Sequence, residues 1–144
     1  MRGMVLTKLF VDTNIFANWL IADNTGHYES SLLIKSCLMG GYVAGFVSSH
    51  SLTDLFYITR KHFPVEERRL FLQLILSRFN VVEESSDMFS AVLADPNCKD
   101  LEDGLQMECA ARERVDFIVT ENIKDFKFSR VKALSAKDAL SMVS

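Results

Sequence analysis

Carboxylate and amide side chains follow two apolar segments of this sequence at the point where each segment ends. Asp12 comes directly after Leu9-Phe10-Val11, and Asn122 and Asp125 come shortly after Phe117-Ile118-Val119. In open parallel sheets, ligands bind in the crevice outside the carboxyl ends of the strands. If the two segments are neighbouring parallel strands, these side chains line one crevice.

Three further carboxylates could reach the same crevice. Asp54 lies shortly after another apolar segment, and Asp100 and Asp103 are three residues apart, so they would share a helix face. Crowded carboxylates repel one another unless protons or cations compensate their charge. Oxygen ligands suit Mg²⁺ or Mn²⁺, and such a metal lowers the pKa of its bound water and offsets charge on a phosphate under attack. The sequence therefore indicates a metal-dependent hydrolase of phosphodiester bonds.

Each of these acids also has a structural interpretation. Asp54 could face solvent, and Asp100 could stabilise the dipole of the helix that it begins. Asp12 is different, because a carboxylate at the end of an apolar strand is costly to bury unless it is hydrogen-bonded or metal-bound. Thr13 and Asn14 could hold the following loop through local hydrogen bonds. Only the acids taken together favour a site.

The other nucleophiles and bases form no recognisable catalytic set. His27, His50 and His62 are interpreted as surface or helix-capping residues. The sequence has no Gly-x-Ser-x-Gly elbow and no Gly-rich phosphate loop. Its three cysteines, at wide spacings, are interpreted as reduced thiols of a cytosolic protein, with a zinc site or a catalytic thiol as the alternative.

The elements that must position the acids alternate between strand and helix patterns. Strands are expected at 5–11, 42–47, 81–82, 117–119 and 131–134. Helices are expected at 14–22, at 27–39, from the serines at 48–51 to residue 60, after Pro64, at 87–94, at 100–114 and after Ser135. The helix after Pro64 is expected to bury Leu70, Phe71, Leu74 and Ile75. With no linker or repeat, the pattern predicts a single α/β domain over residues 1–144, with a parallel sheet of four to five strands.

Charge and hydropathy limit the possible partners. A net charge of −3 is unusual for a protein that binds nucleic acid, but 13 of the 16 Lys and Arg residues lie at or after Arg60. A group that includes Arg60, Lys61 and Arg68 could contact phosphates, or could be an ordinary solvated helix face. No apolar stretch has the length of a membrane span, and no signal segment is evident, so we expect a soluble cytoplasmic protein.

Four segments together resemble the PIN domain family, over nearly the whole chain. They are Val11-Asp12-Thr13-Asn14, Ser51-Leu52-Thr53-Asp54-Leu55, Asp100-Leu101-Glu102-Asp103-Gly104-Leu105-Gln106 and Val119-Thr120-Glu121-Asn122-Ile123-Lys124-Asp125-Phe126. The resemblance is closest to the VapC-like toxins of toxin–antitoxin pairs. It implies a three-layer α/β/α sandwich around a parallel sheet and an endoribonuclease that depends on Mg²⁺ or Mn²⁺. It also implies a homodimer and inhibition by an antitoxin whose tail occupies the groove.

The same resemblance implies roles for individual residues. The first family acid matches Asp12, the second Asp54, where many relatives have Glu, the third Asp103, and the last Asn122 or Asp125. Asp12 and Asp103 are expected to bind the metal directly, and Asp54 and Asp125 are expected to complete the catalytic acids. The residues expected to contact the RNA, or to orient carboxylates and water beside it, are Thr13, Asn14, Thr120, Asn122, Arg60 and Lys61.

Two other classes of protein are compatible with parts of the pattern. A phosphatase of the haloacid dehalogenase type also begins with an Asp at a strand end, but it has a second Asp two residues later, where this sequence has Asn14. A non-catalytic PIN-like scaffold that binds RNA or a protein would keep the fold while losing metal affinity. That alternative predicts weak Mn²⁺ binding and no cleavage.

Overall fold

The computed structural model describes residues 6–143, and its centre is a parallel sheet of five strands in the order β3-β2-β1-β4-β5. The strands are β1 (Thr7–Val11), β2 (Val43–Ser48), β3 (Asn80–Val82), β4 (Phe117–Val119) and β5 (Ala133–Leu134). All four neighbouring pairs are parallel. The five strands were all expected, although β5 is shorter than the predicted 131–134, and Val5 of the first predicted strand lies outside the described residues.

Both faces of the sheet are covered, which explains why the last three residues of β1 are all apolar. Leu9, Phe10 and Val11 are all fully buried, but successive side chains of a strand point to opposite faces. Leu9 and Val11 belong to one hydrophobic cluster and Phe10 to the other. The molecule therefore has two cores, one on each side of the sheet.

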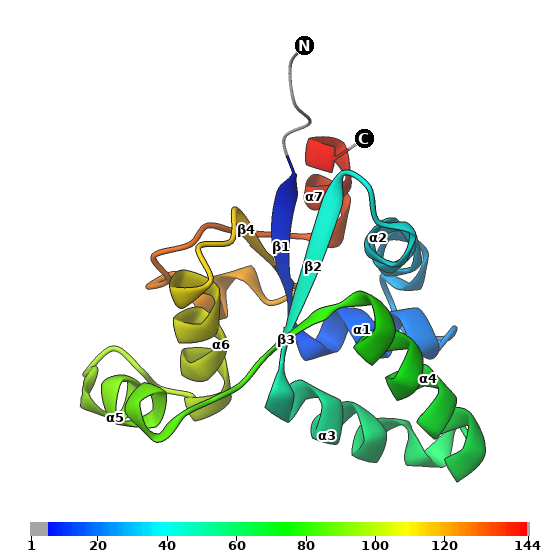
Figure 1. The fold of residues 1–144 in the computed structure, drawn as a ribbon, viewed down its shortest axis with the longest axis horizontal. Coiled ribbons are helices and arrows are strands. Elements are labelled where there is room, and N and C mark those ends of the chain that lie inside the picture. Colours follow the sequence, from blue (N-terminus) through cyan, green and yellow to red (C-terminus); the bar gives the residue numbers. More distant parts are fainter. Residues whose placement is uncertain (1–5, 144) are drawn as a thin grey trace.

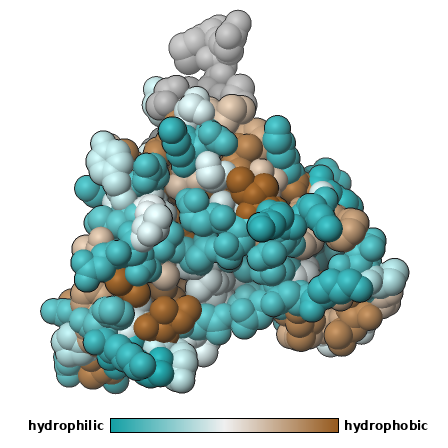
Figure 2. Space-filling model, turned by 180° about the vertical axis from the view of Figure 1, so that it is seen from behind, coloured by the Kyte–Doolittle hydropathy of each residue, from teal (hydrophilic) through white to brown (hydrophobic). Residues whose placement is uncertain are grey.

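Helices form the two outer layers, so the predicted three-layer α/β/α sandwich is confirmed (Figure 1). One core includes residues of α1 (Thr13–Leu20), α2 (His27–Met39), α3 (Ser49–Ile58), α4 (Val65–Arg78) and α7 (Ala136–Val143). The other includes residues of α5 (Ser86–Ala94), α6 (Leu101–Arg112) and the 3₁₀ helix η2 (Ile123–Phe126). A second 3₁₀ helix, η1 (Thr59–Lys61), extends α3. Seen from behind, the surface is mostly hydrophilic, with separate hydrophobic patches (Figure 2).

Two local expectations were wrong. The helix predicted to reach residue 114 ends at Arg112, and Arg114 adopts a left-handed conformation with φ of 53°. On α4, Ile75 is fully buried, but Leu70 is 63% exposed and Leu74 is 40% exposed. Only part of α4 reaches the core. Phe71 packs edge-on against Phe63, just before the helix, and lies near Trp19 of α1.

Candidate active site

The carboxyl ends of β1 and β4 bring Asp12 and Thr120 together. Val11 is paired with Val119, and the Asp12 N–H donates to the Val119 carbonyl at 3.0 Å, so the next residues of the two strands are neighbours. The Thr120 hydroxyl donates to Asp12 Oδ2 at 2.8 Å. The parallel pairing therefore accounts for the first contact of the site.

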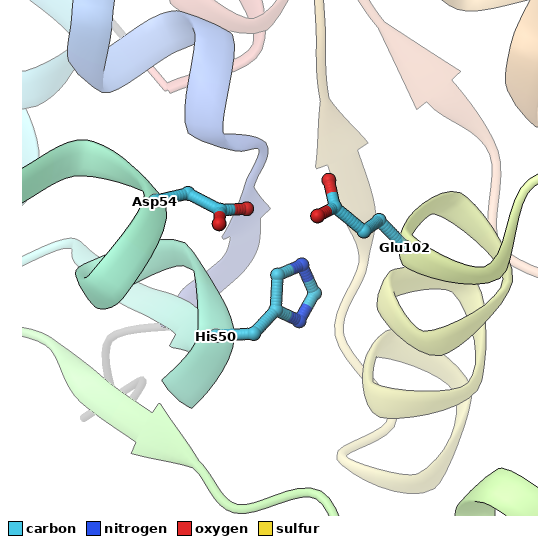
Figure 3. A group of neighbouring side chains, drawn as sticks. All are labelled: His50, Asp54 and Glu102. Carbon is cyan, nitrogen blue, oxygen red and sulfur yellow. The ribbon is translucent and has the colours of Figure 1, made fainter. Parts of the chain in front are cut away.

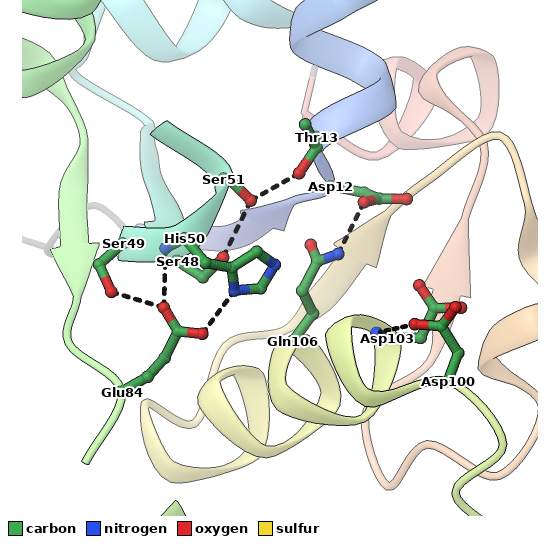
Figure 4. A network of polar contacts seen from close by, with 10 residues as sticks. All are labelled: Asp12, Thr13, Ser48, Ser49, His50, Ser51, Glu84, Asp100, Asp103 and Gln106. Atoms are coloured by element: carbon green, nitrogen blue, oxygen red, sulfur yellow. Dashed lines mark hydrogen bonds and ion pairs between the residues drawn. The ribbon is translucent and has the colours of Figure 1, made fainter. Parts of the chain in front are cut away.

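A second donor reaches Asp12 from α6. The side-chain amide of Gln106 donates to Asp12 Oδ1 at 2.8 Å (Figure 4). Asp12 is only 6% exposed, and burial raises the pKa of its carboxyl, although the hydrogen bonds from Gln106, Thr120 and the Thr13 backbone oppose that shift. The carboxylate is thus held in one orientation at the end of β1.

Two more acids lie at the start of α6. Asp100 is the N-cap of this helix, and its Oδ1 accepts a hydrogen bond of 3.0 Å from the Asp103 backbone. Burial and the negative charges of Asp100, Asp12, Asp125 and Glu102, in that order, raise the pKa of Asp103 to about 7. Asp100 therefore has both roles considered from the sequence, since it caps the helix and adds charge to the cluster.

The surroundings of Asp103 suit a divalent cation. Like charges and burial together disfavour ionised Asp103. A bound cation reverses that penalty, and carboxylate oxygens are the preferred ligands of Mg²⁺ or Mn²⁺. The residues present therefore fit such a metal, with Asp12 and Asp103 able to hold it.

A pocket of about 390 Å³ opens beside these acids, between α5, α6 and η2. Asp100, Asp103 and Asp125 contribute to its lining. Four basic residues line the same pocket, namely Lys99, Lys124, Lys127 and Arg130. An acidic cluster that could hold a cation thus lies next to side chains that could bind phosphate oxygens.

The remaining residues predicted at the site are placed differently. Thr13 bonds the Ser51 hydroxyl at 2.6 Å rather than a carboxylate. The Asn14 side chain accepts a 3.5 Å bond from the Glu121 backbone, and the Asn122 N–H donates to Thr120 Oγ1 at 3.0 Å. The Asn14 contact joins the segments after β1 and β4, the Asn122 contact lies within the loop after β4, and the Thr13 contact joins α1 to α3.

Arg60 and Lys61 lie on η1, at the end of α3 that is remote from β2. The Arg60 guanidinium lies over the Tyr57 ring, 3.6 Å from its centre. Neither residue lines the pocket beside Asp103. The structure therefore does not bring this predicted basic group together with the acids.

Asp54 belongs to a different group of side chains. It lies on α3 with His50, one turn earlier, and both point toward Glu102 of α6 (Figure 3). One ligand atom of each of these three residues lies within 4.8 Å of the others. The second predicted family acid is thus paired with Glu102, which the sequence reasoning did not single out.

His50 is not the simple surface or capping residue that the sequence suggested. Its side chain is 20% exposed, and its Nδ1 lies 2.5 Å from Glu84 Oε2, while the Glu84 side chain is 5% exposed. Glu84 Oε1 accepts from the His50 backbone at 2.8 Å and from the Ser49 hydroxyl. Burial would raise the pKa of Glu84, but these hydrogen bonds outweigh it and lower the pKa.

Gln106 and Glu102 were also missed, although a signal for both exists. They are four residues apart on α6, so they share a face. Gln106 is polar among the buried residues Leu105, Cys109 and Ala110 of the same helix, and a polar residue in a buried stripe requires a partner. That requirement points to a polar site opposite α6.

The model of the PIN domain family matches residues 8–124. The chain belongs to the PIN domain family. This membership agrees with the fold and with the acids at the ends of β1 and β4, and it sets aside the haloacid dehalogenase alternative. A comparison with curated proteins found no significant match.

Several solved structures share the fold. VapBC-1 of nontypeable Haemophilus influenzae has a TM-score of 0.67 and 14% identity over 91% of this chain and 99% of that one. VapBC2 of Rickettsia felis, bound to a DNA fragment from its promoter, has a TM-score of 0.63 and 22% identity over 90% and 98%. VapC20 of Mycobacterium tuberculosis, a toxin that cleaves the sarcin-ricin loop, has a TM-score of 0.62 and 15% identity over 76% and 86%. Within residues 6–143, no helix is long and apolar enough to span a membrane.

Proposed function

We propose that this protein is an endoribonuclease that depends on Mg²⁺ or Mn²⁺, and that it is the toxin of a toxin–antitoxin pair. The observation that carries the nuclease proposal is the convergence of Asp12, Asp100, Asp103 and Asp125 beside a pocket with four basic residues. Clustered carboxylates suit a hard cation, and the basic side chains suit the phosphates on either side of a scissile bond.

In this proposal, Asp12 and Asp103 would bind the metal directly. Asp54 and Asp125 would be the other two catalytic acids. When bound, such a metal would lower the pKa of a coordinated water and would offset negative charge on the phosphate. Thr120 and Gln106 keep the Asp12 carboxylate in place through their hydrogen bonds of 2.8 Å. Fixed ligands lower the cost of organising the site during the reaction.

The basic residues of the pocket would position the RNA. Lys124 and Lys127 lie on or next to η2, and Arg130 follows it, on the wall of the pocket beside Asp125. The net charge of −3 and the mixed lining suit recognition of a defined RNA shape rather than binding to any phosphate backbone. Thr13, Asn14, Thr120 and Asn122 would support the loops that face this substrate.

The toxin assignment is supported by the structural neighbours. They include the toxin VapC20, complexes named VapBC and a toxin–antitoxin complex from Klebsiella pneumoniae. By analogy with these proteins, the partner proposed for this chain is an antitoxin. A homodimer is proposed as well, because the resemblance of the sequence to VapC-like toxins implies one.

The direct test is cleavage of a structured RNA pool by the purified protein in Mn²⁺, in EDTA, and with the variant Asp12→Ala. Asp138→Ala is a matched control, because Asp138 is an exposed acid on α7. We expect cleavage in Mn²⁺ by the wild type and the control only. Full activity of a well-folded Asp12→Ala protein would contradict the proposed site. Absence of both cleavage and Mn²⁺ binding in the wild type would instead favour the non-catalytic scaffold.

A further inference from the structure

We infer that this protein has a second cation site between α3 and α6, formed by His50, Asp54, Glu102 and Gln106, and that its nitrogen ligand selects a transition metal such as Mn²⁺ or Zn²⁺ over Mg²⁺. The inference goes beyond the proposed nuclease, because it concerns a second metal, bound by residues other than Asp12 and Asp103. The two sites are adjacent, since Asp54 is also one of the proposed catalytic acids and Gln106 donates to Asp12. Two residues of each helix contribute, spaced four apart, so both pairs lie on facing helix surfaces.

The His50 ring presents a free lone pair to this space. Its Nδ1 lies 2.5 Å from Glu84 Oε2, and an ionised carboxylate can only accept hydrogen bonds. Nδ1 therefore carries the proton in the neutral ring, and Nε2 has the lone pair. Nε2 is buried and has no hydrogen-bond partner among residues 6–143. A buried lone pair without a donor needs a proton or a cation.

Gln106, which is 2% exposed, independently directs a second lone pair into the same space. Its amide nitrogen donates to Asp12, which fixes the orientation of the amide, because the carboxylate cannot be the donor. The amide oxygen must then face the other way. Figure 4 shows Gln106 between Asp12 and His50, with its oxygen on the side of His50 and Ser51. This oxygen is also buried without a partner in the described part of the chain.

Two acids add negative charge between the helices. Figure 3 shows Asp54 and Glu102 pointing toward one another and toward the His50 ring. The space between the helices thus contains two carboxylates, one amide oxygen and one imidazole nitrogen, all with lone pairs to donate. A cation is the natural complement of this set.

The type of metal follows from the donors. Imidazole nitrogen favours first-row transition metals, whereas Mg²⁺ prefers oxygen ligands and keeps several waters. A histidine that donates its second ring N–H to a carboxylate is a common arrangement at such metals, since it fixes the ring and makes the ligating nitrogen more basic. Glu84 has this role for His50, and its own second oxygen is held by the His50 backbone at 2.8 Å.

The test uses tag-free protein, stripped with EDTA and titrated with Co²⁺, whose visible spectrum reports nitrogen ligation, and with Mn²⁺ in a calorimeter. We expect wild-type protein to develop the Co²⁺ bands, and His50→Gln and Glu102→Gln to weaken Co²⁺ binding at least about tenfold. Glu102 is exposed, so Glu102→Gln keeps the test valid if His50→Gln does not fold. His62→Gln, which removes an exposed histidine, is the matched control and should bind Co²⁺ like the wild type.

Asp103→Asn separates this site from the proposed catalytic metal. We expect Asp103→Asn to retain the nitrogen-ligated Co²⁺ spectrum even if it loses RNA cleavage, so that failure of one proposal leaves the other standing. No Co²⁺ bands in wild-type protein, or unchanged bands in His50→Gln, would overturn the second site.

Discussion

Gln106 donates a hydrogen bond of 2.8 Å to Asp12 although the two residues are 94 positions apart in the sequence. The bond connects the end of β1 to the middle of α6. It also orients both side chains, because each oxygen of Asp12 accepts from one side chain, Oδ1 from Gln106 and Oδ2 from Thr120. The orientation of the Asp12 carboxylate therefore depends on α6, which carries Gln106, and on the end of β4, which Thr120 follows.

Replacing Gln106 by Leu should lower the stability of the metal-free protein by about 1–3 kcal/mol, because it removes the side-chain donor to Oδ1 of buried Asp12. Added Mn²⁺ should recover part of this loss if Asp12 is a ligand. Urea unfolding with and without Mn²⁺ measures both effects. Gln73→Leu is the control, because Gln73 is exposed on α4. Equal stability of the two variants would contradict the role of this hydrogen bond.

The stability of the metal-free protein should depend on pH through Asp103, whose pKa is raised from 3.8 to about 7, first by burial and then by neighbouring acids. Between about pH 4 and pH 7 the folded protein keeps a proton that the unfolded chain has lost. Stability should therefore fall as pH rises through this window and level off above it. The raised pKa values of Asp12 and Glu102 act in the same direction.

Thermal unfolding in EDTA at several pH values measures this effect. Asp103→Asn should flatten the dependence and stabilise the metal-free protein above pH 7. Because a metal must displace the proton, Mn²⁺ affinity of the wild type should decrease as pH falls below about 7. Parallel curves for the wild type and Asp103→Asn would show that the cluster does not hold Asp103 in its protonated form.

Gly45→Ala should destabilise the protein by about 1–3 kcal/mol through overpacking. A Cβ on this residue of β2 would lie 2.5 Å from the Phe79 ring. The ring cannot easily move, because it packs edge-on against Phe16 with 5.1 Å between ring centres. Adding Phe79→Leu should make the Gly45→Ala change less costly, and a double-mutant cycle by urea unfolding measures that coupling. Additive effects would contradict a steric cause.

RNA affinity distinguishes the basic residues of the pocket from those predicted at the end of α3. Joint replacement of Lys124, Lys127 and Arg130 by Gln should weaken RNA binding and reduce its salt dependence by about 0.7 in log–log slope for each phosphate that is no longer neutralised. Joint replacement of Arg60 and Lys61 by Gln is the comparison. Filter binding in EDTA at several salt concentrations avoids cleavage. A larger loss in the second variant would place the RNA along α3 and η1 instead.

The acids at strand ends could be found in the sequence because the signal is local. An apolar segment that ends on Asp12 predicts both a buried strand and a polar edge, and Asp103 follows Asp100 at helical spacing. The same local reasoning was wrong for Leu70 and Leu74. Periodicity marks an apolar helix face, but it does not say how much of that face meets the core.

Patterns within short segments were enough to predict the alternation of strands and helices, the family and the acids Asp12, Asp54, Asp103 and Asp125. Which side chains meet depends instead on how the elements pack. Packing brings Asp54 and His50 of α3 close to Glu102 of α6, and it brings the Gln106 amide within hydrogen-bond distance of Asp12. It also lined the pocket beside Asp103 with Lys124, Lys127 and Arg130. These contacts depend on the order of the strands and on the facing of α3 and α6, which short segments do not encode.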